Sequence, residues 1–243
     1  MKTVAIIQAR MGSTRLPGKV MKKVAGKSLL EQQLMRVGRC KMLDAVVVAT
    51  TEKNEDDLID QECQRLGIDV YRGSEDDVLS RYYYAALEYR ADVIVRLTAD
   101  CPVIDPVIID RVIGYYHEHY PDYDYVSNTL LRTYPRGMDT EVFSFQALEK
   151  AFHQSTDASS REHVTKYIYE HPSEFHLLNV KHYDDLSRFR WTVDTPEDFE
   201  LISKIIESLV PTKPDYTMKD ILELFELHPE WFNINAHVEQ KKV

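Results

Sequence analysis

A dense group of cations opens this chain and could bind a phosphate-rich ligand. The first 30 residues carry seven Lys or Arg and no acid, although the net charge of the whole chain is −10. Three of these cations, Arg10, Arg15 and Lys19, lie in the segment QARMGSTRLPGK. Glycines let the backbone of such a loop approach a ligand closely, and the proline stiffens the turn. Because backbone N–H groups and nearby cations together cradle phosphates, the segment predicts a polyphosphate-binding loop, with a solvated basic loop as the alternative.

Two aspartates, Asp100 and Asp194, each follow an apolar segment that we expect to form a strand. A reaction at a bound polyphosphate requires that negative charge be neutralised on the phosphate oxygens. A divalent metal commonly does this, held by one or two carboxylates and by phosphate oxygens. The two aspartates are therefore candidate metal ligands. The alternatives are structural: Asp100 as a turn cap before Pro102, and Asp194 as part of a helix start at Thr195.

An alternation of predicted strands and helices would position the basic loop and the two aspartates. Apolar β-branched segments predict buried strands, and apolar residues at helical spacing predict helices. The expected strands are 3–8, 44–50, 68–73 and 92–100, and the expected helices are 28–40, 54–67, 75–90 and 105–119. This alternation predicts an α/β fold with a doubly wound, mostly parallel sheet, which binds ligands at the carboxyl ends of its strands. The basic loop follows the first strand at that edge, and Asp100 follows the fourth.

After residue 120 the pattern changes to a smaller, mixed and partly antiparallel extension. The expected strands there are 123–128, 138–144, 175–180 and 189–194, and the expected helices are 145–153, 160–170, 197–208 and 217–226. No segment is long or polar enough to link two independent domains. We therefore expect one domain over residues 1–243, with a first half, 1–120, and a second half, 121–243.

The composition argues against several other classes of protein. The acidic net charge disfavours general binding to nucleic acid or to a membrane surface, and no segment approaches the roughly 20 apolar residues of a membrane span. The apolar run at the N-terminus is too short for a signal peptide. The three cysteines form no CxxC pair, which fits a reducing cytoplasm. The basic loop matches neither a Walker A motif nor G-x-G-x-x-G.

The basic loop resembles the N-terminal signature of the sugar-acid cytidylyltransferases, the enzymes that make CMP-activated sialic acids and 3-deoxy-octulosonic acid. Further segments are similar to blocks of the same group, and the middle ones resemble its spore coat polysaccharide biosynthesis proteins, the SpsF type. These segments are VYRGSEDDVLSRYYYAA, VRLTADCPVIDP, YPRGMDTEVFS, REHVTKYIY and WTVDTPEDF. Nucleotidyltransferases that act on sugar 1-phosphates have two adjacent glycines in the related loop, where this chain has Ala9 and Arg10.

The resemblance implies a nucleotidyltransferase domain with a nucleotide-binding half, 1–120, and a half for sugar binding, metal binding and dimerisation, 121–243. It also implies roles for residues of the nucleotide and metal site. It implies that Asp100 and Asp194 hold Mg²⁺ and that Arg15 and Lys19 receive the departing pyrophosphate. Backbone groups of the loop would bind the cytosine edge, and the turn at 72–77 would face the base and ribose. The expected nucleotide-binding residues are Ala9, Arg10, Met11, Gly12, Ser13, Arg72, Ser74 and Asp77. For that turn the alternative is that Ser74 caps the following helix.

The second half contains the residues expected to bind the sugar. They are Arg136, Asp139, Glu141, Arg161 and His163. An arginine suits a sugar carboxylate because its planar fork can bind both oxygens. The alternatives are surface ion pairs and, for the segment REHVT, a contact between subunits. The resemblance also implies a homodimer.

The expected activity is transfer of CMP from CTP to a sugar acid, with release of pyrophosphate, in surface or spore-coat polysaccharide biosynthesis. One alternative is nucleotidyl transfer to a sugar or polyol phosphate, which calls for a phosphate clamp in the second half. Another is a glycosyltransferase that uses a nucleotide sugar on the same fold and releases no pyrophosphate. The last is a nucleotide-binding protein without catalytic activity.

Overall fold

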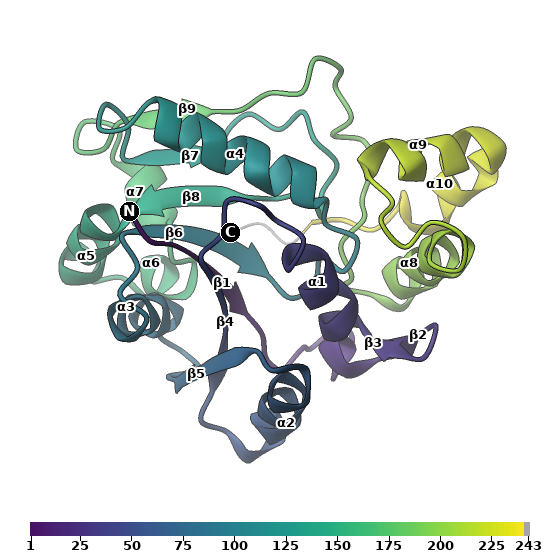
Figure 1. Cartoon of the computed structure of the whole chain (residues 1–243), viewed down its shortest axis with the longest axis horizontal. Coiled ribbons are helices and arrows are strands. Elements are labelled where there is room, and N and C mark those ends of the chain that lie inside the picture. Colours follow the sequence, from purple (N-terminus) through teal and green to yellow (C-terminus); the bar gives the residue numbers. More distant parts are fainter. Residues whose placement is uncertain (241–243) are drawn as a thin grey trace.

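Within residues 1–240, the part of the chain that the computed structural model describes, seven strands form one sheet (Figure 1). Their order is β5-β4-β1-β6-β8-β7-β9. The first four are parallel, β8 is antiparallel to β6 and β7, and β9 is parallel to β7. Their bounds are β1 Thr3–Gln8, β4 Ala45–Thr51, β5 Asp69–Gly73, β6 Val93–Thr98, β7 Tyr125–Ser127, β8 Glu141–Ser144 and β9 Leu177–Asn179. A small hairpin joins β2, Lys23–Val24, to β3, Lys27–Ser28. The predicted fold class is confirmed.

Helices cover both faces of this sheet, and the central strand shows why. Ala5 and Ile7 of β1 pack with α1, α2 and α4 in one apolar cluster, while Val4 and Ile6 pack with α3, α5 and α7 in another. Successive side chains of a strand point to opposite faces, so a strand covered on both sides is apolar throughout. The helices are α1 Leu29–Val37, α2 Asp57–Leu66, α3 Val78–Glu88, α4 Pro106–Glu118, α5 Phe145–Gln154, α6 Ala158–Glu162 and α7 Lys166–Glu170.

A third apolar cluster lies at the C-terminal end of the chain. It is built by α8, Pro196–Leu209, α9, Met218–Leu227, and α10, Phe232–Asn235, which lie together in Figure 1. These helices pack around the buried indole of Trp191. Short 3₁₀ turns complete the chain at Lys19–Met21, Asn54–Asp56 and Pro229–Trp231. In the described part of the chain, no helix combines the length and apolar character needed to cross a membrane.

Two predicted elements are wrong. Residues 189–194 form no strand; they make a single parallel bridge between Arg136 and Arg190 and then donate the N–H of Val193 to the carbonyl of Asp100 at 2.8 Å. β6 ends at Thr98, so it does not extend far enough to form a ladder of strand hydrogen bonds with residues 189–194. The predicted helix 160–170 is two helices, α6 and α7, broken where Val164 has a φ of 36°. A β-branched residue in that left-handed region is incompatible with a continuous α-helix.

Gly137 holds the segment that leads to Asp194 against the rest of the fold. Its φ is +100°, and a Cβ added there would lie 2.5 Å from the carbonyl oxygen of Trp191. Its neighbour Arg136 exchanges backbone hydrogen bonds with Phe189 and Trp191, at 3.0 and 2.7 Å. Only a residue without a side chain lets these two backbones meet.

Gly137→Ala is therefore expected to destabilise the fold by more than an alanine at a positive φ alone, which costs roughly 1–2 kcal/mol. The matched control is Gly26→Ala, where φ is +79° and a new Cβ would meet nothing within 4 Å. Urea unfolding of both variants measures the difference. Equal losses in the two variants would show that the contact with Trp191 is unimportant.

Candidate active site

The ammonium of Lys19 joins the basic loop to both candidate aspartates. Its Nζ donates to Asp100 Oδ2 at 3.1 Å, to Asp194 Oδ1 at 2.8 Å and to the carbonyl oxygen of Val193 at 2.8 Å. Lys19 follows Gly18, whose φ of 64° turns the loop back. Asp100 and Asp194, which are 81 and 175 positions from Lys19 in the sequence, thus meet it at the carboxyl edge of the parallel strands. The juxtaposition expected from the sequence is present.

Both members of the Lys19–Asp100 pair are charged at neutral pH. Burial alone would raise the pKa of the Asp100 carboxyl, but the Lys19 ammonium and a hydrogen bond from Thr98 outweigh it and lower the pKa to about 2. Burial alone would lower the pKa of Lys19, but Asp100 and Asp194 together raise it. The Thr98 hydroxyl donates to Asp100 Oδ1 at 2.5 Å, so each carboxylate oxygen of Asp100 has a partner.

Asp194 is fixed from a second side by arginines and a helix start. Its Oδ2 forms an ion pair with Arg15 at 3.0 Å and accepts a hydrogen bond from Arg190 at 2.8 Å. Arg190 also binds the fully buried Asp198 at 2.9 and 3.0 Å. Asp198 forms a capping box with Thr195 at the start of α8 and accepts the N–H of Asp194 at 2.9 Å. Asp194 is therefore both part of a helix start and a member of the charged cluster.

The two aspartates fit a metal that also binds phosphate. Among the described residues, no group of three or more His, Cys, Asp or Glu could hold a metal ion. Carboxylates that share one ammonium are close enough to share one cation, and magnesium in nucleotide sites commonly takes one or two protein carboxylates with phosphate oxygens. The donor set is thus one for Mg²⁺ completed by a substrate, and unsuited to an all-protein metal cage.

A cavity of about 280 Å³ opens above this cluster. Its walls are the basic loop, the end of β6 and Asp194; the lining residues are Gln8, Ala9, Arg10, Gly12, Ser13, Thr14, Arg15, Lys19, Val20, Thr98, Ala99, Asp100 and Asp194. Met11 does not line it. Instead its N–H donates to Asp56 at 2.6 Å and its carbonyl accepts from Ser13 and Gly18, so Met11 shapes the loop.

The turn at 72–77 contributes structural contacts rather than cavity walls. Arg72 binds Asp57 at 2.6 Å and the carbonyls of residues 51 and 53. Asp77 is the N-cap of α3, where Ser74 was the predicted cap, and it pairs with Arg161. Ser74 accepts the N–H of Asp77 at 3.1 Å. None of these residues lines the cavity above the cluster, and the structure does not bring Arg161 to the other sugar-site residues.

A second cavity, of about 240 Å³, shares Thr98 with the first. Three of the predicted sugar-binding residues line it, and with them several that the sequence did not single out. The lining residues are Arg96, Leu97, Thr98, Thr129, Arg132, Asp139, Glu141, His163, Thr165 and Tyr169. Arg136 is not among them and lines a separate cavity beside Arg190. The two cavities that meet at Thr98 form one cleft, which we call the catalytic cleft.

The acids of the second cavity are held by arginines. Arg132 binds both oxygens of Asp139, at 2.5 and 2.8 Å. Glu141 pairs with Arg96 and accepts from the hydroxyls of Tyr125 at 2.5 Å and Thr165 at 2.6 Å. Burial alone would raise the pKa of Glu141, but Arg96 and these hydroxyls lower it.

The sequence carried a signal for Arg96 that was missed. It is a charged residue inside a buried strand, two positions before Thr98. A charge in such a place needs a partner or a ligand. Arg132 lies in a loop without any regular pattern, so no comparable signal pointed to it.

Comparison with known proteins identifies the family. A family model described as cytidylyltransferase matches residues 4–242. The chain is 34% identical to the spore coat polysaccharide biosynthesis protein SpsF of Bacillus subtilis, over 93% of this chain and 94% of that protein.

Solved structures agree. A cytidylyltransferase from Leptospira borgpetersenii superposes with a TM-score of 0.92 at 34% identity, covering 100% of both chains. CMP:2-keto-3-deoxy-manno-octonic acid synthetase complexed with CTP has a TM-score of 0.68 at 16% identity, covering 86% of this chain and 99% of that one; this likeness shows the shared fold. The chain therefore belongs to the cytidylyltransferase family, and within it to the SpsF type.

Proposed function

We propose that this protein transfers CMP from CTP to a sugar acid and releases pyrophosphate, in the biosynthesis of a surface polysaccharide such as a spore coat. One observation carries the proposal: the first cavity of the catalytic cleft contains two carboxylates and two loop cations, and the second cavity beside it has two arginines in its walls. The first part suits a triphosphate and the second suits an acidic acceptor. The names of the SpsF relative and of the CTP-bound synthetase support the same reaction class.

In this reaction the anomeric hydroxyl of a 2-keto-3-deoxy acid attacks the α-phosphorus of CTP. A new bond forms between that oxygen and phosphorus, the hydroxyl proton passes to water, and the bond from the α-phosphorus to the pyrophosphate oxygen breaks. Arg15 and Lys19 lie where they can take up the negative charge of the departing pyrophosphate. Asp100 and Asp194 would hold Mg²⁺, which when bound neutralises charge on the α-phosphate.

The residues of this chain act mainly by positioning. Lys19 keeps Asp100 ionised and holds the two carboxylates close together, and Arg190 orients Asp194 through its other oxygen. The loop backbone at Ala9 and Gly12 lines the cavity and can approach the nucleotide without side chains in the way. Holding donor and acceptor in line at the meeting point of the two cavities supplies much of the rate in such transfers.

The acceptor half is best suited to a carboxylate. Arg132 and Arg96 line the second cavity. Arg132 already pairs with Asp139, and Arg96 already pairs with Glu141. Paired in this way, they offer their remaining N–H groups as hydrogen-bond donors with little net charge. Such N–H groups can bind a substrate carboxylate through charge-assisted hydrogen bonds. We also propose that the protein works as a homodimer in the cytoplasm.

Asp100→Asn is expected to lower the rate of Mg²⁺-dependent pyrophosphate release by at least about 100-fold, the loss typical for removal of one charge-stabilising group. The assay offers CTP, UTP, GTP and ATP, each with a panel of sugar acids and sugar phosphates. The matched control is Asp184→Asn, an exposed aspartate outside the catalytic cleft. Full activity of the Asp100 variant would refute the metal-site proposal, and turnover only with a sugar phosphate would refute the sugar-acid assignment.

Arg132→Lys is expected to raise the KM for the sugar acid at least about tenfold while leaving the KM for CTP within about twofold. Lysine keeps the charge but loses both the fork that holds Asp139 and the remaining guanidinium N–H groups that we propose donate to the substrate carboxylate. Steady-state kinetics with each substrate varied in turn measure both constants. Arg111→Lys, on the exposed side of α4, serves as the control. An equal rise in both constants would place Arg132 outside the acceptor site.

A further inference from the structure

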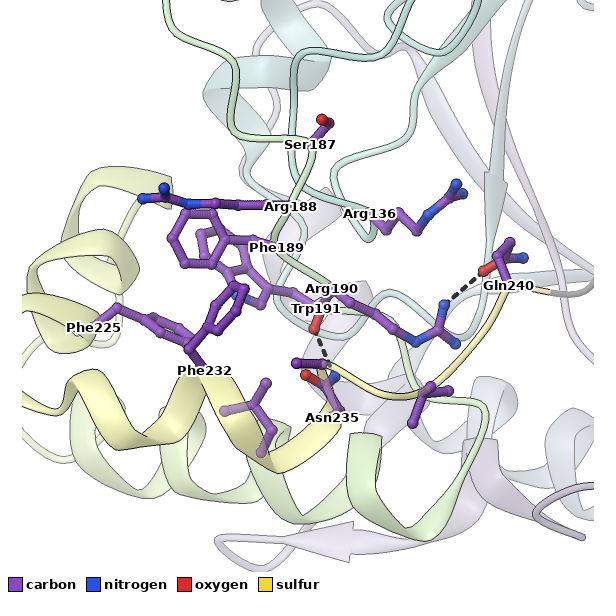
Figure 2. A pocket seen from close by; sticks show the side chains of 13 residues that line it. Arg136, Ser187, Arg188, Phe189, Arg190, Trp191, Phe225, Phe232, Asn235 and Gln240 are labelled. Carbon is purple, nitrogen blue, oxygen red and sulfur yellow. Dashed lines mark hydrogen bonds between the residues drawn. The ribbon is translucent and has the colours of Figure 1, made fainter.

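A cavity of about 120 Å³ lies between the segment before Asp194 and the C-terminal helices (Figure 2). It shares no lining residue with the two cavities of the catalytic cleft. Three arginines line it, Arg136, Arg188 and Arg190, and none of its described lining residues is acidic. We call it the C-terminal cavity. Nothing in the proposed reaction uses it.

One end of the C-terminal cavity is cationic. Figure 2 shows Arg136 and the guanidinium of Arg190 on the side of Gln240, whose Oε1 accepts from Arg190 Nη1 at 2.6 Å. Within the described residues, the guanidinium of Arg136 has no hydrogen bond or ion pair, although it is only partly exposed. Burial and the nearby cations Arg132 and Arg190 lower its pKa, and only Asp139 opposes them. This positive charge lacks a partner.

The other end is aromatic. Phe189 packs against the rings of Trp191, Phe225 and Phe232, with ring centroids 5.1–5.8 Å apart. Arg188 extends to this end and lies over the Phe189 ring at 5.0 Å, away from Arg136 (Figure 2). The fully buried indole N–H of Trp191 has no hydrogen-bond partner among the described residues.

We propose that the C-terminal cavity binds a small organic anion, with its oxyanion between Arg136 and Arg190 and its flat apolar part against the aromatic end. The shared chemistry is a carboxylate or a phosphate ester on a body of about one ring. This cavity, of about 120 Å³, is less than half the size of the cavity of about 280 Å³ above the aspartates, which favours a ligand smaller than a nucleotide. The oxyanion takes the place of the Gln240 amide oxygen on Arg190, whose other nitrogen binds Asp194.

Trp191 provides a direct probe of this site. The chain has two tryptophans, so Trp231→Phe leaves Trp191 as the single tryptophan, whose emission can be excited selectively. Benzoate, phenyl phosphate and benzyl alcohol are titrated into this variant while its emission is recorded. A saturable change with benzoate, phenyl phosphate or both, but not with benzyl alcohol, supports the proposal, and the better anion identifies the head group. No saturable response to either anion, or an equal response to benzyl alcohol, overturns it.

Further substitutions in the Trp231→Phe background locate the anion. Arg136→Gln is expected to weaken binding at least about tenfold, the range for loss of a charged hydrogen-bond donor. Arg111→Gln, which removes the same charge from the exposed surface of α4, is expected to leave it unchanged. Arg15→Gln tests for binding in the catalytic cleft instead, and loss of the response in that variant would overturn the proposal.

Gln240→Glu gives a second test that cannot be explained by misfolding, because Gln240 is exposed and follows the last helix. Its new carboxylate would compete with the ligand for Arg190, and we expect at least about tenfold weaker binding. Unchanged affinity in both Arg136→Gln and Gln240→Glu would show that the anion does not lie between these two side chains.

Discussion

The shared ammonium of Lys19 is the interaction on which the site depends. It brings the loop after β1, the end of β6 and the segment before α8 into one cluster, although they are distant in sequence. Two carboxylates close enough to bind the same ammonium would repel each other without a cation between them. Desolvation makes the arrangement costly unless every charge is paired, and here each carboxylate oxygen has a partner.

The surrounding fold can be understood as support for that cluster. The parallel strands end at one edge, which sets the loop and Asp100 side by side. Gly137 and the bridge at Arg136 then position the segment of Asp194 against this edge. Arg190, held by the buried Asp198, fixes Asp194 from behind. Rigid placement of this kind is what a transfer reaction dominated by positioning requires.

Much of this could be predicted from the sequence. β1, β4 and β6 are largely apolar runs whose residues are mostly buried, so their pattern is strong. The basic loop stood out because glycines and cations occur there without acids. Asp100 and Asp194 stood out because each follows an apolar segment, although the segment before Asp194 is no strand.

The remainder depends on tertiary contacts that leave no local pattern. Arg72 pairs with Asp57, and Asp77 pairs with Arg161; these partners could not be foreseen from the sequence, and the predicted ligand contacts of the three residues stay predictions. Arg132 and Arg190 are placed by packing between distant segments, which spacing along the chain does not reveal. The break at Val164 likewise follows from how α6 and α7 pack, since the residues around it are compatible with a helix.

The most direct test of the account is a crystal structure of the protein with CTP and Mg²⁺. The account predicts a triphosphate against residues 9–19 and a metal that contacts both Asp100 and Asp194 as well as the α-phosphate. A triphosphate bound elsewhere, or a metal held by neither aspartate, would contradict the assignment of this cluster as the catalytic centre.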